Sequence, residues 1–282
     1  MEYGLSTRLF VAERLSSRLL DRILEAGFRQ IEIFAAPQHL DYHDPNHARD
    51  LAQWFRDLGV ALHSVHAPLF SEPGGGRRGG FAISIAYAAR RLRIDSMDEI
   101  KRTLEVSERI PFRFLVLHLG LDQDEYTLEK YDAAFTSLEH LRVFAKERGV
   151  SLLLENTSGE LGKPARLIQF LRYTHLDDVG ICFDAGHAHL GGDALEGLRI
   201  LRERVASAHL HDNRGEKDEH LPPLEGGIPW PALLQDLEGA TAKPNGFCAF
   251  LELQDHGQET TRLPRLRELV RKLEEREGER RE

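Results

Sequence analysis

Cysteine is scarce in this chain, which has only Cys182 and Cys248 among its 282 residues. Both lie in apolar, strand-like segments, so we expect reduced, buried side chains and neither a disulfide nor a thiolate metal site. No apolar run reaches the length of about 18 residues that a membrane-spanning helix needs. The first residues also lack a signal-peptide pattern, because their apolar run is short and acids interrupt it. These absences predict a cytoplasmic protein without a membrane partner.

Basic residues are outnumbered, with 37 lysines and arginines against 46 aspartates and glutamates, and the formal net charge is −9. This balance argues against a protein that binds nucleic acid, although a local basic patch matters more than the total. The G-x-G-x-x-G fingerprint of dinucleotide-binding folds is also missing after the first expected strand. Histidine, in contrast, is abundant at 14, and many histidines follow apolar runs. We therefore look for the functional residues among the histidines and the acids.

Short apolar segments alternate with amphipathic segments along the whole chain. The apolar segments are typical of parallel strands buried on both faces. The expected strands are Gly4–Phe10, Gln30–Phe34, Val60–His66, Phe112–Leu119, Val150–Glu155, Val179–Phe183, Val205–His211 and Gly246–Leu253. The expected helices are Leu15–Glu25, Pro45–Leu58, Met97–Arg109 (with Asp95 or Ser96 as its N-cap), Thr127–Arg148, Pro164–Tyr173, Leu195–Arg204, Trp230–Leu237 and Thr261–Glu275.

Eight strands that alternate with eight helices, without a linker, predict an α/β fold made of a single (β/α)8 TIM barrel. A length of 282 residues is close to the usual size of such a barrel. The alternative is an open doubly wound sheet, which the missing glycine fingerprint disfavours. We expect one domain over residues 1–282, with a frayed, charged tail after about residue 278.

The stretch Val179–Asp193 (VGICFDAGHAHLGGD) carries the first chemical signal. Its alternate apolar residues form the sixth strand, and we expect Cys182 to face the surrounding helices. Asp184 and His187 leave the end of this strand together, and a carboxylate beside an imidazole is suited to holding a metal. A lone D-x-x-H is a weak signal, because it also occurs in capped turns.

The signal becomes strong because acids and histidines recur at the ends of the later strands. All strand C-termini of a TIM barrel meet at one face, where active sites are built. The groups expected there are His66, His118, Glu155, Asp184, His187, His209, Asp218, His220 and Glu252. Each one taken singly is more often a structural residue, but their recurrence at consecutive strand ends predicts a metal centre.

Nitrogen and oxygen ligands of this kind suit Zn or Mn best and also accommodate Mg or Co. Several acids in one cleft would repel one another, and divalent ions relieve that repulsion. His211 shares the inward face of its strand with His209, because the two residues are two positions apart. The spacing alone leaves open which of these two histidines is the ligand.

Several segments carry a specific resemblance, namely HAP after the third strand, LHLG after the fourth, LLLENTSG, VGICFDAGH, AHLHDN with DEHLPPLEGG, and FLEL. In these segments, which together extend over nearly the whole chain, the sequence resembles the xylose-isomerase-like TIM barrel superfamily. That superfamily includes sugar-phosphate isomerases and epimerases as well as endonuclease IV. Its motifs are specific to the superfamily but not to one reaction.

The resemblance to ketose 3-epimerases implies one ion, Mn or similar, held by Glu155, Asp184, His209 and Glu252, and it selects His209 over His211. It also implies that Glu155 and Glu252 form the acid/base pair and that His187 contacts the substrate. The resemblance to endonuclease IV implies three zinc ions held by the full set, which then includes His66, His118, His187, Asp218 and His220. This sequence keeps every one of these positions.

The leading hypothesis is therefore a metal-dependent isomerase or epimerase of a sugar or a sugar-like polyol, which moves a proton next to a carbonyl. Arg214, just past the seventh strand, is either a substrate ligand or a solvated loop residue. The partner is a small molecule, and the oligomeric state stays open.

The alternative hypothesis is endonuclease IV-like hydrolysis of phosphodiesters at abasic DNA by a trinuclear zinc site. The net charge is negative, and the loop after the seventh strand carries the acids Glu216, Asp218 and Glu219. Both features disfavour DNA binding at this face of the barrel. A further alternative is a barrel that binds a sugar or a metal without turnover, which the paired glutamates disfavour.

Overall fold

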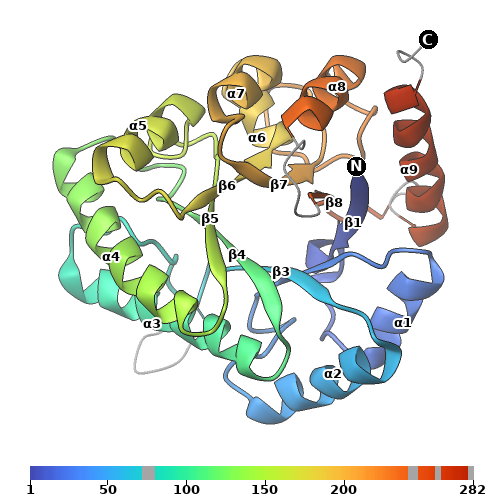
Figure 1. Cartoon of the computed structure of the whole chain (residues 1–282), viewed down its shortest axis with the longest axis horizontal. Coiled ribbons are helices and arrows are strands. Elements are labelled where there is room, and N and C mark those ends of the chain that lie inside the picture. Colours follow the sequence, from blue (N-terminus) through green and yellow to red (C-terminus); the bar gives the residue numbers. More distant parts are fainter. Residues whose placement is uncertain (72–79, 241–246, 258–261, 279–282) are drawn as a thin grey trace.

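The computed structural model describes residues 1–71, 80–240, 247–257 and 262–278. Eight parallel strands form a closed barrel in chain order, and the eighth strand pairs with the first (Figure 1). The strands are β1 (Glu2–Ser6), β2 (Ile31–Phe34), β3 (Leu62–His66), β4 (Phe112–His118), β5 (Ser151–Glu155), β6 (Gly180–Asp184), β7 (Val205–Leu210) and β8 (Cys248–Leu251). This confirms the (β/α)8 TIM barrel and excludes the open doubly wound sheet.

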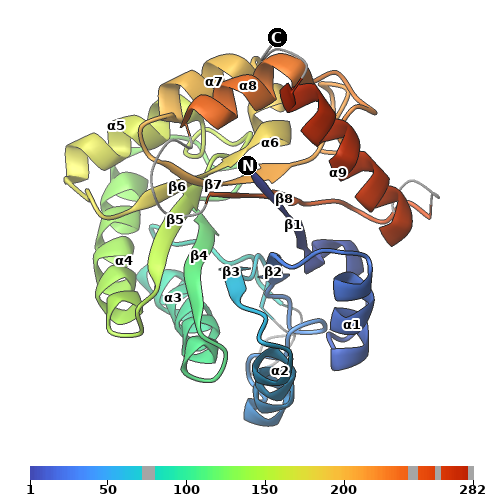
Figure 2. The same ribbon diagram turned by 45° about the vertical axis from the view of Figure 1, so that its right-hand side comes forward.

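Helices surround the ring of strands on its outside, as both ribbon views show (Figures 1 and 2). They are α1 (Ser17–Glu25), α2 (Pro45–Leu58), α3 (Arg90–Glu105), α4 (Leu128–Lys146), α5 (Pro164–Thr174), α6 (Ala185–Leu190), α7 (Ala194–Leu201), α8 (Trp230–Ala240) and α9 (Leu263–Gly278), with 3₁₀ turns at Thr7–Phe10 and Val106–Glu108. None of the helices in the described ranges is long and apolar enough to cross a membrane.

Polar residues at the helix ends explain where several of these helices begin and stop. The Ser16 hydroxyl accepts a hydrogen bond from the backbone N–H of Leu19 at the start of α1. Asp44 caps α2 in the same way, and Pro45 occupies the first helical position, where its missing N–H costs nothing. Gly59 ends α2 with a φ of 60°, a conformation that glycine adopts without strain.

The core has two parts, one between the strands and the helices and one inside the barrel. Phe183 belongs to the outer part, whereas Cys182 packs with Phe114, Val116 and Leu153 in a small separate cluster. The expectation that Cys182 faces the helices was therefore wrong. Strand alternation places it on the inner face, two residues before Asp184. Burial raises the pKa of its thiol to about 12, so it supplies no thiolate to the site.

Other expected boundaries shift for local reasons. β1 ends at Ser6, because the Ser6 hydroxyl accepts from the backbone N–H of Arg8 and starts a 3₁₀ turn. α3 begins at Arg90 rather than after Asp95 or Ser96, and the Ser96 hydroxyl accepts from the backbone N–H of Ser84 instead of capping the helix. The short α6 was not expected. The expected element starts Gly246 and Thr261 and the tail after residue 278 lie outside the described residues.

Candidate metal centre

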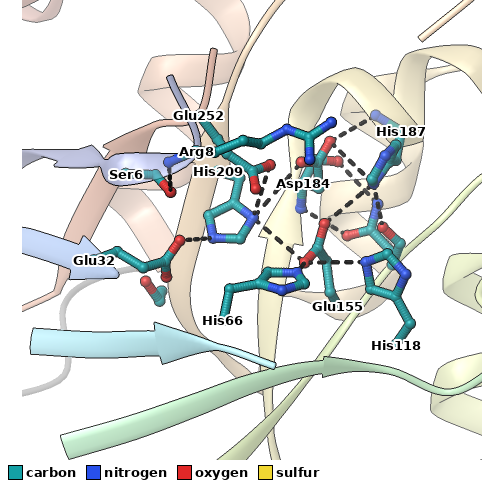
Figure 3. A network of polar contacts seen from close by, with 12 residues as sticks. Ser6, Arg8, Glu32, His66, His118, Glu155, Asp184, His187, His209 and Glu252 are labelled. Carbon is teal, nitrogen blue, oxygen red and sulfur yellow. Dashed lines mark hydrogen bonds and ion pairs between the residues drawn. The ribbon is translucent and has the colours of Figure 1, made fainter. Parts of the chain in front are cut away.

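The C-terminal ends of the strands carry the predicted ligands to one face of the barrel. β3 ends on His66, β4 on His118, β5 on Glu155 and β6 on Asp184. The other groups lie on β7, in α6 directly after β6, in the loop after β7, and directly after β8. Figure 3 shows the side chains converging, with dashed contacts linking them. The structure therefore brings together all nine residues that the sequence singled out as ligands.

The central group consists of Glu155, Asp184, His209 and Glu252, whose ligand atoms all lie within 4.8 Å of one another. His209 Nδ1 is 3.4 Å from Glu155 Oε2, 3.5 Å from Glu252 Oε2 and 3.8 Å from Asp184 Oδ2. All four side chains are buried. Three carboxylates are therefore gathered around one imidazole nitrogen in a volume from which water is largely excluded.

A second group shares Glu155 with the first. His66 Nε2 lies 3.0 Å and His118 Nε2 3.5 Å from Glu155 Oε2. These three residues also place one ligand atom each within 4.8 Å of the others. A carboxylate shared between two such groups can bridge two ions, which is the arrangement that a polynuclear site needs.

A third group comprises His187, His211, Asp218 and His220. Asp218 Oδ2 lies 3.2 Å from His187 Nε2 and 3.0 Å from His220 Nε2. His211 stacks on His220 with ring centroids 3.8 Å apart, and its Nε2 is 3.0 Å from Asp184. His209 thus joins the central group and His211 joins the third, so both histidines lie among candidate ligands, and the choice of His209 stays a prediction.

Inside the cluster, the positive charge of protonated histidines balances the negative charge of the carboxylates. Burial disfavours the ionised Glu155 carboxylate, but His209 and His118 outweigh burial and hold the pKa of this carboxyl well below its usual range. Burial likewise opposes the protonation of His209, yet the surrounding acids raise its pKa well above the usual value. A divalent cation would take over the role of these imidazolium charges.

Unsatisfied polar atoms test whether a cation fits here. Glu155 Oε1 and both ring nitrogens of His209 are buried and make no well-oriented hydrogen bond, although charged neighbours lie close. Buried polar atoms in native proteins nearly always have a partner, so orphans at the centre of a ligand cluster point to a ligand. Imidazole nitrogen and carboxylate oxygen are donors that Zn and Mn accept. The residues therefore fit a divalent metal.

Glu32 is a member of the site that the sequence analysis missed. It lies on β2, is fully buried, and places Oε1 3.0 Å from His209 Nε2. Its other oxygen accepts a hydrogen bond of 2.8 Å from the Ser64 hydroxyl. Burial works against ionisation, but His209 keeps the pKa of the carboxyl below its usual value. An acid inside the short apolar run QIEIF was the available signal.

Two arginines, Arg214 and Arg8, differ in their relation to the site. Arg214 points to solvent with 63% of its side chain exposed and pairs with Glu219, so its contact with substrate stays a prediction. Arg8, which the sequence analysis did not single out, follows β1 and places Nη2 3.2 Å from His220 Nε2. The 3₁₀ turn after Ser6 carries Arg8 to this face, and the sequence signal for that turn was weak.

Asp212 holds the loop that carries Asp218 and His220. It is fully buried, and its carboxylate accepts hydrogen bonds from the Trp230 indole and from the backbone N–H groups of Asn213, Leu224 and Ile228. His220 itself has a positive φ of 46°, which is uncommon for a residue other than glycine. The loop is thus clamped in a conformation that delivers two ligands.

The comparisons with known proteins agree with this architecture. The model of the xylose isomerase-like TIM barrel family matches residues 20–275. An uncharacterized protein of Methanocaldococcus jannaschii, MJ1311, is 29% identical over 248 residues, which cover 84% of this chain and 80% of that protein. A probable endonuclease 4 of Mycobacterium leprae is 27% identical over 171 residues, covering 55% of this chain and 60% of that protein.

Solved structures share the fold over the full length. A D-tagatose 3-epimerase-like protein superposes with a TM-score of 0.80 at 24% identity and covers 100% of both chains. A D-psicose 3-epimerase with D-fructose gives 0.76 at 14% identity, covering 99% of this chain and 100% of that one. The IOLI protein with a bound zinc atom gives 0.74 at 16% identity, covering 99% and 98%. With its family match over most of its length, the chain belongs to the xylose isomerase-like TIM barrel family.

Proposed function

We propose that this chain is a metal-dependent isomerase or epimerase, which acts on a sugar or a sugar-like polyol by proton transfer next to a carbonyl. The observation that carries the proposal is the central group, where two glutamates from the non-adjacent strands β5 and β8 share one ligand cluster within 4.8 Å. The names of the D-tagatose 3-epimerase-like protein and the D-psicose 3-epimerase support this kind of reaction. We further propose that the protein works in the cytoplasm.

The central group would hold the divalent ion through Glu155, Asp184, His209 and Glu252. When bound, such an ion supplies polarisation of a carbonyl and of a neighbouring hydroxyl. The zinc atom bound to the IOLI protein supports zinc, and the donor set also suits Mn, with Mg or Co as further candidates. Burial of the group keeps water away from the reacting carbon and strengthens every charge interaction there.

The two glutamates carry the proton transfer. Burial opposes ionisation of Glu155, but His209 and His118 outweigh it and keep the pKa of its carboxyl low, so this group is ionised, as a general base must be before it accepts a proton. Glu252 reaches the same centre from β8 and can return the proton from another side. Return to the opposite face of the carbon inverts its configuration, whereas return to the neighbouring carbon moves the carbonyl. His187 is the proposed substrate ligand when a single ion is bound.

Solvent exchange tests this proposal. The metal-loaded protein is incubated with a panel of ketoses in D2O, and deuterium incorporation next to the carbonyl is followed by NMR. We expect exchange that Glu155→Gln and Glu252→Gln each reduce by about 10²-fold or more. Glu139→Gln, at an exposed position of α4, is the matched control and should exchange like the wild type. Absence of exchange with every ketose would contradict the proposal.

A second candidate function is phosphodiester hydrolysis at abasic DNA. The observation in its favour is that the three ligand groups adjoin one another and two of them share Glu155, as a trinuclear centre requires. The match to a probable endonuclease 4 also supports it. The net charge of −9 disfavours it, because DNA binding relies on positive charge along the phosphates.

Two measurements separate these candidates. Metal content per chain, determined by mass spectrometry after dialysis against zinc, is expected to be one for the isomerase and three for the nuclease. Cleavage of an oligonucleotide with one abasic site is then assayed beside an intact duplex. Cleavage at the abasic site by the wild type, but not by Glu155→Gln, would favour the nuclease and overturn the ranking given above.

A further inference from the structure

A cavity of about 410 Å³ opens between the loops that follow β1, β2 and β3. Its walls include Arg8, Phe34, Gln38, Leu69, Phe70 and Ser71. The volume lies within the range of sites that take small molecules. The cavity is therefore large enough for a substrate rather than for a few water molecules only.

Two of its walls touch the metal centre directly. Phe34 stacks on His66 with ring centroids 4.8 Å apart. Arg8 Nη2 lies 3.2 Å from Nε2 of His220, a member of the third group. Figure 3 shows the Arg8 side chain extending toward the ligand groups. A molecule in this cavity would thus lie against Arg8 and Phe34, the two side chains that separate it from His220 and His66.

Arg8 is poised for an anion. Within the described part of the chain, no carboxylate forms an ion pair with it, and its buried Nε makes no hydrogen bond. Its guanidinium lies over the ring of Phe34, 5.2 Å from the centroid, which restrains its orientation. Arginine presents several N–H donors in a planar fork that matches a phosphate or a carboxylate. A restrained arginine in a cavity wall, with N–H donors that make no hydrogen bond, is therefore suited to binding an anionic ligand.

The other described residues that line the cavity also favour an anionic ligand. It is mainly apolar, with Val11, Ala35, Leu69 and Phe70 among its residues, and Arg8 is the cationic side chain among them. Apolar walls exclude water, and an ion pair formed there is screened less than one at the surface. The acids of the site gather around the histidines of the metal centre. Once those acids are neutralised by divalent ions, the charge of Arg8 is left to attract an anion.

We propose that the substrate is an anionic polyol, whose phosphate or carboxylate group Arg8 binds in this cavity while its carbonyl end reaches Glu155 and Glu252. The inference rests on the proposed sugar reaction and adds a charge requirement to it. Arg8 is here a substrate-binding residue, and it takes no part in the proton transfer.

Calorimetric titration of the zinc-loaded protein tests the charge requirement through binding affinity rather than through activity. The probes are D-fructose 6-phosphate, D-gluconate and neutral D-fructose. We expect at least one anionic probe to bind more tightly than D-fructose, and Arg8→Gln to weaken that probe about 10- to 100-fold. Binding of the phosphate probe alone assigns a phosphate, binding of D-gluconate alone assigns a carboxylate, and binding of both assigns anionic charge as such.

Controls separate a local effect from misfolding. Arg142→Gln removes an arginine that pairs with Asp178 on the outside of the barrel and should leave all three affinities unchanged. Arg8→Lys keeps the charge without the planar fork and should give an intermediate affinity. Zinc content and melting temperature of each variant verify that the fold and the metal centre persist.

Different results would overturn the anion site and the proposed reaction. Equal affinity for charged and neutral probes, or a preference that persists in Arg8→Gln, overturns the inference even if D-fructose exchanges its proton. Arg8-dependent binding of an anionic polyol that never exchanges a proton supports the binding site and overturns the proposed reaction.

Discussion

Glu32 Oε1 lies 3.0 Å from Nε2 of His209, and Nδ1 of the same ring faces the carboxylates of Glu155 and Glu252 (Figure 3). A carboxylate on one side of an imidazole favours the tautomer that carries its proton there, which leaves the other nitrogen free for a metal. The Ser64 hydroxyl holds the second oxygen of Glu32 at 2.8 Å and prevents it from turning away. Glu32 is therefore positioned to orient a metal ligand without contacting the metal.

Glu32→Gln is expected to weaken zinc binding about 10- to 100-fold, because an amide cannot supply the negative charge that makes His209 a stronger ligand. Competition with a chromophoric chelator measures the affinity directly. Glu139→Gln on the outer face of α4 should bind zinc like the wild type. A folded Glu32→Gln protein that binds zinc as tightly as the wild type would show that Glu32 does not support His209 as a metal ligand.

Gly186→Ala should damage the third ligand group selectively. A Cβ at Gly186 would lie 2.0 Å from His211 Cε1 and 2.2 Å from its Nδ1, so the imidazole must move. Gly191→Ala is the matched control, since its Cβ would approach nothing nearer than the Ala188 carbonyl oxygen at 3.4 Å. We expect lower zinc content in the first variant only, measured by mass spectrometry at saturating metal. Equal zinc content in both variants would show that His211 is not needed for metal binding.

Asp212→Ala is expected to lower the free energy of unfolding by about 3 kcal/mol or more, because three buried donors and one partly buried donor lose a charged acceptor. Urea unfolding measures this change. Zinc content should fall as well, because the released loop carries Asp218 and His220. Asp193→Ala removes an exposed N-cap carboxylate of α7 and should cost only about 1 kcal/mol. Similar losses in the two variants would contradict the clamping role of Asp212.

His39 links stability to pH. It is fully buried between the Glu13 carbonyl oxygen, 2.6 Å from Nδ1, and the Thr7 hydroxyl, 2.9 Å from Nε2. Burial lowers its pKa to about 4 from a value of 6.5 for an exposed histidine, although the bond to the Glu13 carbonyl acts in the opposite direction. Between these two values the unfolded chain binds one proton more than the folded protein does, so stability falls as the pH falls.

The expected loss from His39 is about 1.4 kcal/mol per pH unit within this window. Urea unfolding of the wild type and of His39→Gln across the same window measures it. The variant cannot titrate at this position, so its stability should depend less steeply on pH, whatever its stability at neutral pH. Parallel pH dependences of the two proteins would show that His39 is protonated in the folded state.

The barrel and its ligands follow from the sequence because strand periodicity is regular and chemical residues recur at strand ends. His66, His118, Glu155 and Asp184 each close a strand, as the apolar runs before them indicate. Once a closed parallel barrel is assumed, topology alone carries these side chains to one face. The fold and the convergence of these side chains were therefore the predictable part, and their role as ligands stays a prediction.

The missed residues depend on contacts between segments far apart in the chain. Glu32 acquires its role only through His209 and Ser64, which come from β7 and β3. Arg8 reaches the site through a 3₁₀ turn that follows from one serine side chain, and no apolar pattern signals such a turn. Cys182 was assigned to the wrong face because the small cluster inside the barrel is apolar, as is the layer between the strands and the helices. Apolar character alone therefore does not distinguish the two faces of the strand.

Anomalous diffraction from crystals of the zinc-loaded protein would locate the metal itself. We expect a peak at the zinc edge bounded by His209 Nδ1 and by carboxylate oxygens of Glu155, Asp184 and Glu252, at about 2.0–2.2 Å from each. A protein that is saturated with zinc in solution but shows no peak among these four residues would contradict the account.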